Sequence, residues 1–287
     1  MTHLSHSSSM EITPYIQTLS RIRWSDALPD KIGQPLYFYK KGCWSPRLLT
    51  ESDPDYDFEN PLLNLNFEFR HKLLDDVEFE VPLFHVNREV RGFALAWVHK
   101  KGLTIRFDKK RVCAVFVRAF DPMIDTPYVP LGKWDEFLRE PFDRHFELDL
   151  IEKNINCPGP AFTRVAVSEA VLRGEDNSLA EISDWYARVR KVFIIVDAQP
   201  NLDMQSEDYG EDDDMRLQRR WDIESSALGV KLFWNNDHGE FKWANREDLG
   251  DKGLCKLIEE ASNGVGEKLV GYGRRRFEVR PVFTVRK

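Results

Sequence analysis

The sequence lacks long apolar runs, closely spaced cysteine pairs and an N-terminal basic region followed by an apolar one. Its apolar runs are short, Val192–Val196 being typical, whereas a transmembrane helix needs about 20 apolar residues. We therefore expect no signal peptide, no membrane span and an intracellular location, cytoplasmic or nuclear. The cysteines are scattered without a CxxC motif, which predicts free thiols in a reducing compartment and no cysteine-based zinc site. They are Cys43, Cys113, Cys157 and Cys255.

A broad excess of basic residues is also missing. The net charge is −7, and the segment Asp203–Asp214 alone carries seven acidic residues and no base, so the rest of the 287-residue chain is neutral overall. Binding to nucleic acid or to an anionic membrane through the whole surface needs many surplus Lys and Arg residues. The composition therefore disfavours both partners and leaves room only for a local basic patch.

The hydrophobic periods predict a mixture of strands and helices. Apolar residues occupy every second position in Asn64–Arg70, as in a half-buried strand, and recur at spacings of three and four from Val86 to Val98, as in an amphipathic helix. Asn87 is a candidate N-cap and Gly102 a candidate end for that helix. The fold class we expect is α/β or α+β, with a mixed sheet and flanking helices. Further strands are expected at Leu103–Phe107, Val112–Phe120, Phe162–Val167 and Val192–Val196, and further helices at Trp134–Phe146 and Leu179–Val189.

Changes in composition predict four parts of the chain. Residues 1–34 would be a flexible arm, residues 35–200 an α/β domain, residues 201–215 an acidic linker or loop, and residues 216–287 a strand-containing C-terminal appendage that packs on the main domain. Within the last part we expect a helix over Arg216–Ala227, a hairpin joining Lys231–Trp234 to Glu240–Trp243, a helix over Leu254–Ala261 and a final strand over Arg276–Val285. Pro281 should confine that strand to an edge or a bulge.

Two Glu-x-Arg triplets, Glu68-Phe69-Arg70 and Glu89-Val90-Arg91, are followed by the segment Phe120–Tyr128, which has the pattern Phe-x-Pro-x-x-Asp-x-x-Tyr. Over roughly Asn64 to Val196 the chain resembles the fungal two-EXR domain family, named for its two Glu-x-Arg motifs. The resemblance implies no catalytic residue, cofactor or activity. In that family the first triplet follows a helix start, whereas here it lies in a predicted strand.

The charged residues of these segments form one candidate site, either a structural ion network or an anion pocket. Arg91 lies next to Val90 on the apolar stripe, so we expect its guanidinium to be partly buried and paired with a carboxylate of Asp121, Asp125 or Glu68. The candidate cluster comprises Glu68, Arg70, Arg88, Glu89, Arg91, Asp121 and Asp125.

A second candidate is a basic surface on the C-terminal strand. Alternation places several arginines on its polar face, where the acidic segment Asp203–Asp214 could cover them. That acidic segment is expected to be a mobile loop. The arginines are Arg274, Arg276, Arg280 and Arg286.

No spacing in the sequence indicates a catalytic triad, a metal site or a phosphate loop. The function we expect is therefore a protein-interaction or regulatory module without catalysis, whose partner is another protein. One alternative is a small-molecule or anion-binding protein, or an enzyme, that uses Arg88 and Arg91 with Asp121 and Asp125. A further alternative is a nucleic-acid-associated protein. The sequence gives no oligomeric state.

Overall fold

The computed structural model describes residues 28–29, 32–61, 64–148, 150, 157, 159–174, 179–182, 186–203, 216–224, 229–271, 273 and 276–287. The chain divides into two compact units at boundaries that differ from those expected. One unit is Met1–Ile32 with Val81–Thr104, and the other is Gly33–Glu80 with Ile105–Lys287. Most of the acidic segment, residues 204–215, lies outside the described residues, so its predicted mobility stays a prediction.

The smaller unit contains the predicted amphipathic helix. A 3-10 helix, η4 (Pro82–His85), precedes α2 (Arg88–Lys100). The Asn87 side chain accepts a hydrogen bond from the Val90 amide at 2.9 Å, which caps the helix as expected. Gly102 follows the C-terminal end of α2 and has φ +67°. This left-handed conformation favours glycine and ends the helix, as expected. The buried positions of the apolar stripe are Val90, Ala94 and Val98.

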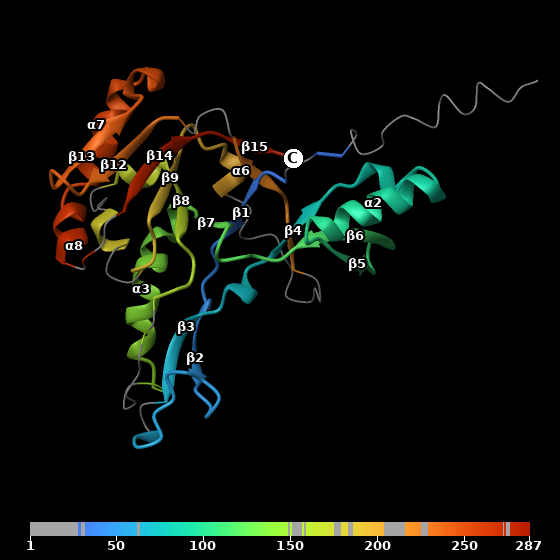
Figure 1. Cartoon of the computed structure of the whole chain (residues 1–287), viewed down its shortest axis with the longest axis horizontal. Helices are drawn as coiled ribbons and strands as arrows, with labels where there is room; N and C mark the ends of the chain where they lie inside the picture. The colour runs from blue at the N-terminus through green and yellow to red at the C-terminus, as the bar shows by residue number, and fades with distance from the viewer. Residues whose placement is uncertain are drawn as a thin grey trace, which may run out of the picture. The chain divides into compact units, whose positions relative to one another are not determined.

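A nine-stranded mixed sheet dominates the larger unit, together with sheets of four and two strands (Figure 1). In sheet order the nine strands are β13 (Glu240–Ala244), β12 (Lys231–Asn235), β14 (Glu278–Val282), β9 (Lys191–Ile195), β8 (Arg164–Ser168), β7 (Thr126–Val129), β1 (Gln34–Phe38), β11 (Trp221–Ile223) and β15 (Thr284–Arg286). The four-stranded sheet runs β10 (Leu217–Gln218), β4 (Asp76–Phe79), β6 (Cys113–Arg118), β5 (Thr104–Asp108), and β2 (Trp44–Leu48) pairs with β3 (Leu65–Phe69).

The α-helices that the structure describes in this unit are α3 (Trp134–His145), α4 (Glu169–Leu172), α6 (Pro200–Asp203), α7 (Lys252–Ala261) and α8 (Val265–Gly271). Short 3-10 helices occur at His71–Leu73, Leu131–Lys133, Leu179–Glu181 and Arg246–Leu249. Within the described ranges, no helix has the length and apolar composition to cross a membrane. The mixed α and β content confirms the predicted fold class.

The nine-stranded sheet curls back on itself. Strands β14 and β15 occupy the third and the last positions of the sheet order, yet only Phe283 separates them in the chain. The intervening strands must therefore curve around to meet the same chain segment. They enclose an apolar cluster to which six strands contribute, from Leu36 and Phe38 of β1 to Val282 of β14. This curl puts the larger unit's core inside the sheet.

The C-terminal segment contributes the strands β12, β13, β14 and β15 to the nine-stranded sheet. The strand expected over Arg276–Val285 forms both β14 and β15. Strand β14 pairs with β12 on one side and with β9 on the other and is not an edge strand, whereas β15 is the last strand of the sheet order. Pro281 is tolerated in this interior strand because β12 begins at Lys231 and is paired only with Glu278 and Val279. The missing N–H of Pro281 thus falls beyond the end of β12, where no ladder hydrogen bond is lost.

One predicted helix is wrong. Residues 217–218 and 221–223 form strands where the sequence predicted a helix over Arg216–Ala227. Trp221 and Ile223 alternate into the apolar cluster, and the Gln218 side chain bonds the backbone of β1 at Phe38 N (3.0 Å) and Leu36 O (2.6 Å). Tertiary pairing therefore overrides local helix propensity here. Of the helix expected over Leu179–Val189, the structure describes a 3-10 helix, Leu179–Glu181, the helical residue Ile182 and a turn that follows Tyr186, while residues 183–185 lie outside the described residues, so this helix stays a prediction.

Candidate functional site

The residues of the candidate cluster from the Glu-x-Arg triplets are divided between the two units. Glu68 and Arg70 lie on β3, where Glu68 Oε2 pairs with Arg47 Nε at 2.9 Å and the Arg70 guanidinium donates to the Pro46 carbonyl at 3.0 Å. Arg88, Glu89 and Arg91 lie on α2 in the smaller unit and are exposed. The two triplets therefore take part in separate local contacts.

Arg91 is not the partly buried residue that the sequence predicted. Its Nε donates to the Phe84 carbonyl at 3.0 Å, and its guanidinium lies over the Phe84 ring, 5.2 Å from the centroid. The residue lies in the first turn of α2, where the side chain can reach back over the preceding 3-10 helix. The long aliphatic stem and flat head of Arg91 thus cover an aromatic ring instead of entering a core.

Asp125 is the buried carboxylate of the predicted cluster, and its cation is Arg118. Arg118 donates to Asp125 Oδ1 at 2.6 Å, and the Asp121 backbone N–H donates to Oδ2 at 2.8 Å. Burial raises the pKa of Asp125 to about 6, against the opposing effect of Arg118. These contacts hold the β6–β7 connection closed, so both oxygens of Asp125 have structural partners.

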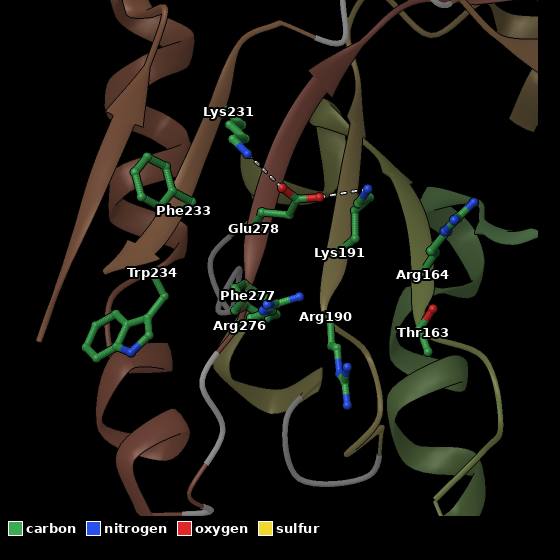
Figure 2. Close-up of a pocket in the computed structure, with 10 residues that line it drawn as sticks. All are labelled: Thr163, Arg164, Arg190, Lys191, Lys231, Phe233, Trp234, Arg276, Phe277 and Glu278. Carbon is green, nitrogen blue, oxygen red and sulfur yellow. Dashed lines mark hydrogen bonds and ion pairs between the residues drawn. The ribbon is translucent and has the colours of Figure 1, made fainter. Parts of the chain in front are cut away.

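An open pocket of about 430 Å3 instead lies where the parallel strands β8, β9 and β14 begin (Figure 2). The register places Phe233, Glu278, Lys191 and Arg164 side by side across β12, β14, β9 and β8. Directly opposed residues point to the same face of a sheet, so this row forms one surface. We call the site the entry pocket. Its cationic lining residues are Arg164, Arg190, Lys191, Lys231 and Arg276.

Backbone hydrogen bonds fix a second row of the entry pocket just before the first. Arg190 N donates to the Thr163 carbonyl, Glu278 N donates to the Arg190 carbonyl, and Trp234 N donates to the Phe277 carbonyl, each at 2.9 Å. The backbone hydrogen bonds of the sheet thus extend to the residues just before β8 and β9, and they hold four chain segments together. The cations of the pocket are therefore brought together by rigid backbone pairing.

Glu278 is the acidic residue of the entry pocket, and it lies between two lysines (Figure 2). Its Oε1 is 2.7 Å from Lys191 Nζ, and its Oε2 is 3.5 Å from Lys231 Nζ and 3.0 Å from the Arg280 guanidinium. Burial on its own raises the pKa of Glu278, but the hydrogen bonds from Arg280 and Lys191 outweigh it and hold that pKa at about 2. Glu278 is therefore ionised at neutral pH.

Two cations of the entry pocket are available to a ligand. Arg190 and Arg276 are exposed, and neither forms an ion pair within the part of the chain that the structure describes. Arg164 is partly engaged, since its guanidinium donates to the Ile124 carbonyl at 2.6 Å. Five cations against one carboxylate leave the pocket with surplus positive charge, although the whole chain carries −7.

One side of the entry pocket is aromatic. Lys231 Nζ lies 5.5 Å from the centroid of the Phe233 ring, and the Trp234 ring meets Phe241 edge to face at 5.2 Å. A Cβ added to Gly266 of α8 would lie 2.5 Å from the Trp234 ring, so glycine is what allows this close approach. Trp234 is thus fixed between β13 and α8, and both rings line the pocket.

Part of the predicted basic surface lies at this site. Arg276 lines the entry pocket, and Arg280 pairs with Glu278. Arg286 is exposed on β15, which pairs with β11, and Arg274 lies outside the described residues. The sequence analysis missed Arg164, Arg190, Lys191 and Lys231, although each lies within two residues of the start of a predicted strand. That shared position was the available signal in the sequence. Only the order of the strands in the sheet shows that these residues lie together.

Within the described ranges, no three His, Cys, Asp or Glu side chains are placed to hold a metal ion. A scan against protein-family models and searches of curated proteins and of solved structures found no match to this chain. The resemblance to the two-EXR family therefore stays a prediction that depends on the two triplets and on the segment Phe120–Tyr128.

Proposed function

We propose that the chain is a non-catalytic interaction or regulatory module that binds an anionic ligand in the entry pocket. The observation that carries the proposal is an open pocket lined by five cations and one carboxylate, within a chain of net charge −7. Arg190 and Arg276 supply planar donors suited to phosphate or carboxylate oxygens. Such a local concentration of charge attracts an anion even when the protein as a whole repels it.

The chemistry of the lining residues supports binding over catalysis. The described residues that line the entry pocket include no His, Cys or Ser. A carboxylate with a pKa of about 2 that is engaged by three cations is a poor general base at neutral pH. The alternative enzyme site has less support, because Asp125 is used by Arg118 and by the Asp121 amide.

The same proposal places the protein inside the cell, in the cytoplasm or nucleus. All four cysteines are free thiols, and two of them, Cys43 and Cys255, are buried. Free thiols are typical of proteins kept in a reducing compartment. A ligand-binding regulatory module there would pass its signal to another protein, whose identity is open.

The test is a calorimetric titration of the full chain with inorganic tripolyphosphate at low salt. Arg190→Ala with Arg276→Ala should weaken binding by at least about tenfold, because each charge-assisted hydrogen bond lost is worth about 1.5–3 kcal/mol. Both side chains are exposed, so the double variant should keep the thermal midpoint of the parent.

The matched control is Arg286→Ala, which removes an exposed arginine of β15 that does not line the entry pocket. It should bind tripolyphosphate as the parent does. Equal loss in the control and in the double variant would mean that the anion responds to net charge alone. That result, or no binding by the parent chain, would overturn the proposal.

A further inference from the structure

The entry pocket offers a ligand three different chemistries at fixed places. Arg190 and Arg276 present cationic donors, Glu278 presents a hydrogen-bond acceptor, and Phe233 and Trp234 present aromatic rings (Figure 2). Its volume of about 430 Å3 lies within the range of small-molecule sites, about 300–1,000 Å3. A bare inorganic anion would use only the first of these chemistries.

Glu278 makes the pocket selective. An ionised carboxylate accepts hydrogen bonds and cannot donate one, so it repels a second anion unless that anion carries a donor group beside its charge. Its two oxygens have three cationic partners in the structure, which leaves acceptor capacity for a ligand hydroxyl or N–H group. A suitable ligand therefore combines an anionic group with neighbouring hydrogen-bond donors.

The aromatic side adds a third requirement. Trp234 is half-buried and held by Phe241 and by the close approach of Gly266, so its ring is positioned before a ligand arrives. A flat ring that stacks on such a platform gains about 1–3 kcal/mol. Preorganised rings cost a ligand little ordering entropy.

We propose that the ligand of the entry pocket is a nucleoside monophosphate, with its phosphate held by Arg190 and Arg276, its sugar or base donors bonded to Glu278 and its base against Trp234. This inference rests on the proposed function, because it names the chemical class of the anion. The inference is compatible with weak binding of a larger anion through the two arginines alone.

The experiment compares matched probes by calorimetry with the full chain: adenosine 5′-monophosphate, uridine 5′-monophosphate, ribose 5-phosphate, inorganic phosphate and adenosine. At least one nucleotide should bind at least about tenfold more tightly than ribose 5-phosphate, the difference expected for one stacked base. Ribose 5-phosphate should in turn exceed inorganic phosphate. Adenosine without its phosphate should bind most weakly of the nucleoside probes.

Two variants assign these differences to residues. Trp234→Ala should lower nucleotide affinity to that of ribose 5-phosphate while leaving ribose 5-phosphate unchanged. Glu278→Gln should raise the affinity for inorganic phosphate and reduce the preference for ribose 5-phosphate over it. Circular dichroism and thermal melting confirm that each variant is folded; if Glu278→Gln is not, the comparison of ligands on the parent chain and Trp234→Ala decide the question.

The outcomes separate this inference from the proposed function. Equal affinities for all the phosphate compounds, with loss of tripolyphosphate binding in the Arg190→Ala and Arg276→Ala double variant, would overturn the nucleotide inference and leave anion binding intact. Nucleotide binding that the double variant does not weaken would overturn both. Binding of a short oligothymidylate at least about a hundredfold more tightly than any mononucleotide would replace the inference with single-strand recognition.

Discussion

The ion pair between Arg118 and Asp125 permits a prediction whose size follows from burial. The side chain of Asp125 is 2% exposed and that of Arg118 is 12% exposed. Removing one partner of a buried pair costs about 3–5 kcal/mol, because the other charge stays behind without compensation. We expect Arg118→Met to lower the free energy of unfolding at pH 7 by about 3 kcal/mol, the lower end of that range, since Arg118 retains some contact with water.

The same variant should cost much less in acid. The pKa of Asp125 is about 6 in the folded chain, above the ordinary aspartate value of 3.8, so its carboxyl is mostly protonated at pH 4.5. With the negative charge gone, Arg118 has little left to compensate, and a loss of about 1 kcal/mol from packing should remain. The difference between the two pH values is therefore the diagnostic quantity.

Urea denaturation of the parent, Arg118→Met and Arg91→Ala proteins at both pH values measures these changes. Arg91→Ala is the matched control, because Arg91 is exposed and contacts Phe84, so it should change the stability by no more than about 0.5 kcal/mol. A loss below about 1 kcal/mol for Arg118→Met at pH 7, or the same loss at both pH values, would refute the reasoning.

Three further predictions concern the larger unit. Asp125→Asn should flatten the dependence of stability on pH. The raised folded pKa of Asp125 makes the parent protein lose stability as the pH rises from about 4 to about 6, and the variant lacks this titrating group. Thermal melts of both proteins across that pH range measure the difference. Glu140→Gln should lower the free energy of unfolding, measured by urea denaturation, by about 2–3 kcal/mol, because the buried Glu140 carboxylate accepts a hydrogen bond from the Gly42 amide at 2.6 Å. Glu136→Gln is the control and should lower it by about 1 kcal/mol or less, because Glu136 forms a more exposed ion pair with Lys41. Val112→Gly should raise stability by about 1 kcal/mol, because Val112 has φ 52° in the turn between β5 and β6; an unchanged or lower melting temperature would contradict this.

Local elements of this fold could be predicted from the sequence because local physics determines them. The cap at Asn87 and the stop at Gly102 delimit α2, and the all-apolar run after Lys191 is a strand buried on both faces. The helix expected at Trp221 failed because the segment is short and alternates between one face and the other. Its pairing with β1 and β15, which the sequence does not reveal, decides its conformation.

The entry pocket could not be predicted, because its parts come from four distant segments. Arg164, Lys191 and Glu278 each open a strand, but only the parallel order of β8, β9 and β14 brings them into one row. Pro281 predicts an edge or a bulge for the final strand, and neither indicates that Glu278 lies in the middle of the sheet. The two Glu-x-Arg triplets predicted a site instead, but Glu68 and Arg91 form local contacts.

The most direct test of the anion site is to locate a bound anion. A crystal of the full chain soaked in tungstate, a heavy analogue of phosphate, should give an anomalous peak in the entry pocket within contact distance of Arg190 and Arg276. The peak should disappear in crystals of the variant in which both arginines are alanine. Strong tungstate peaks elsewhere on the protein, with the entry pocket empty, would contradict the account.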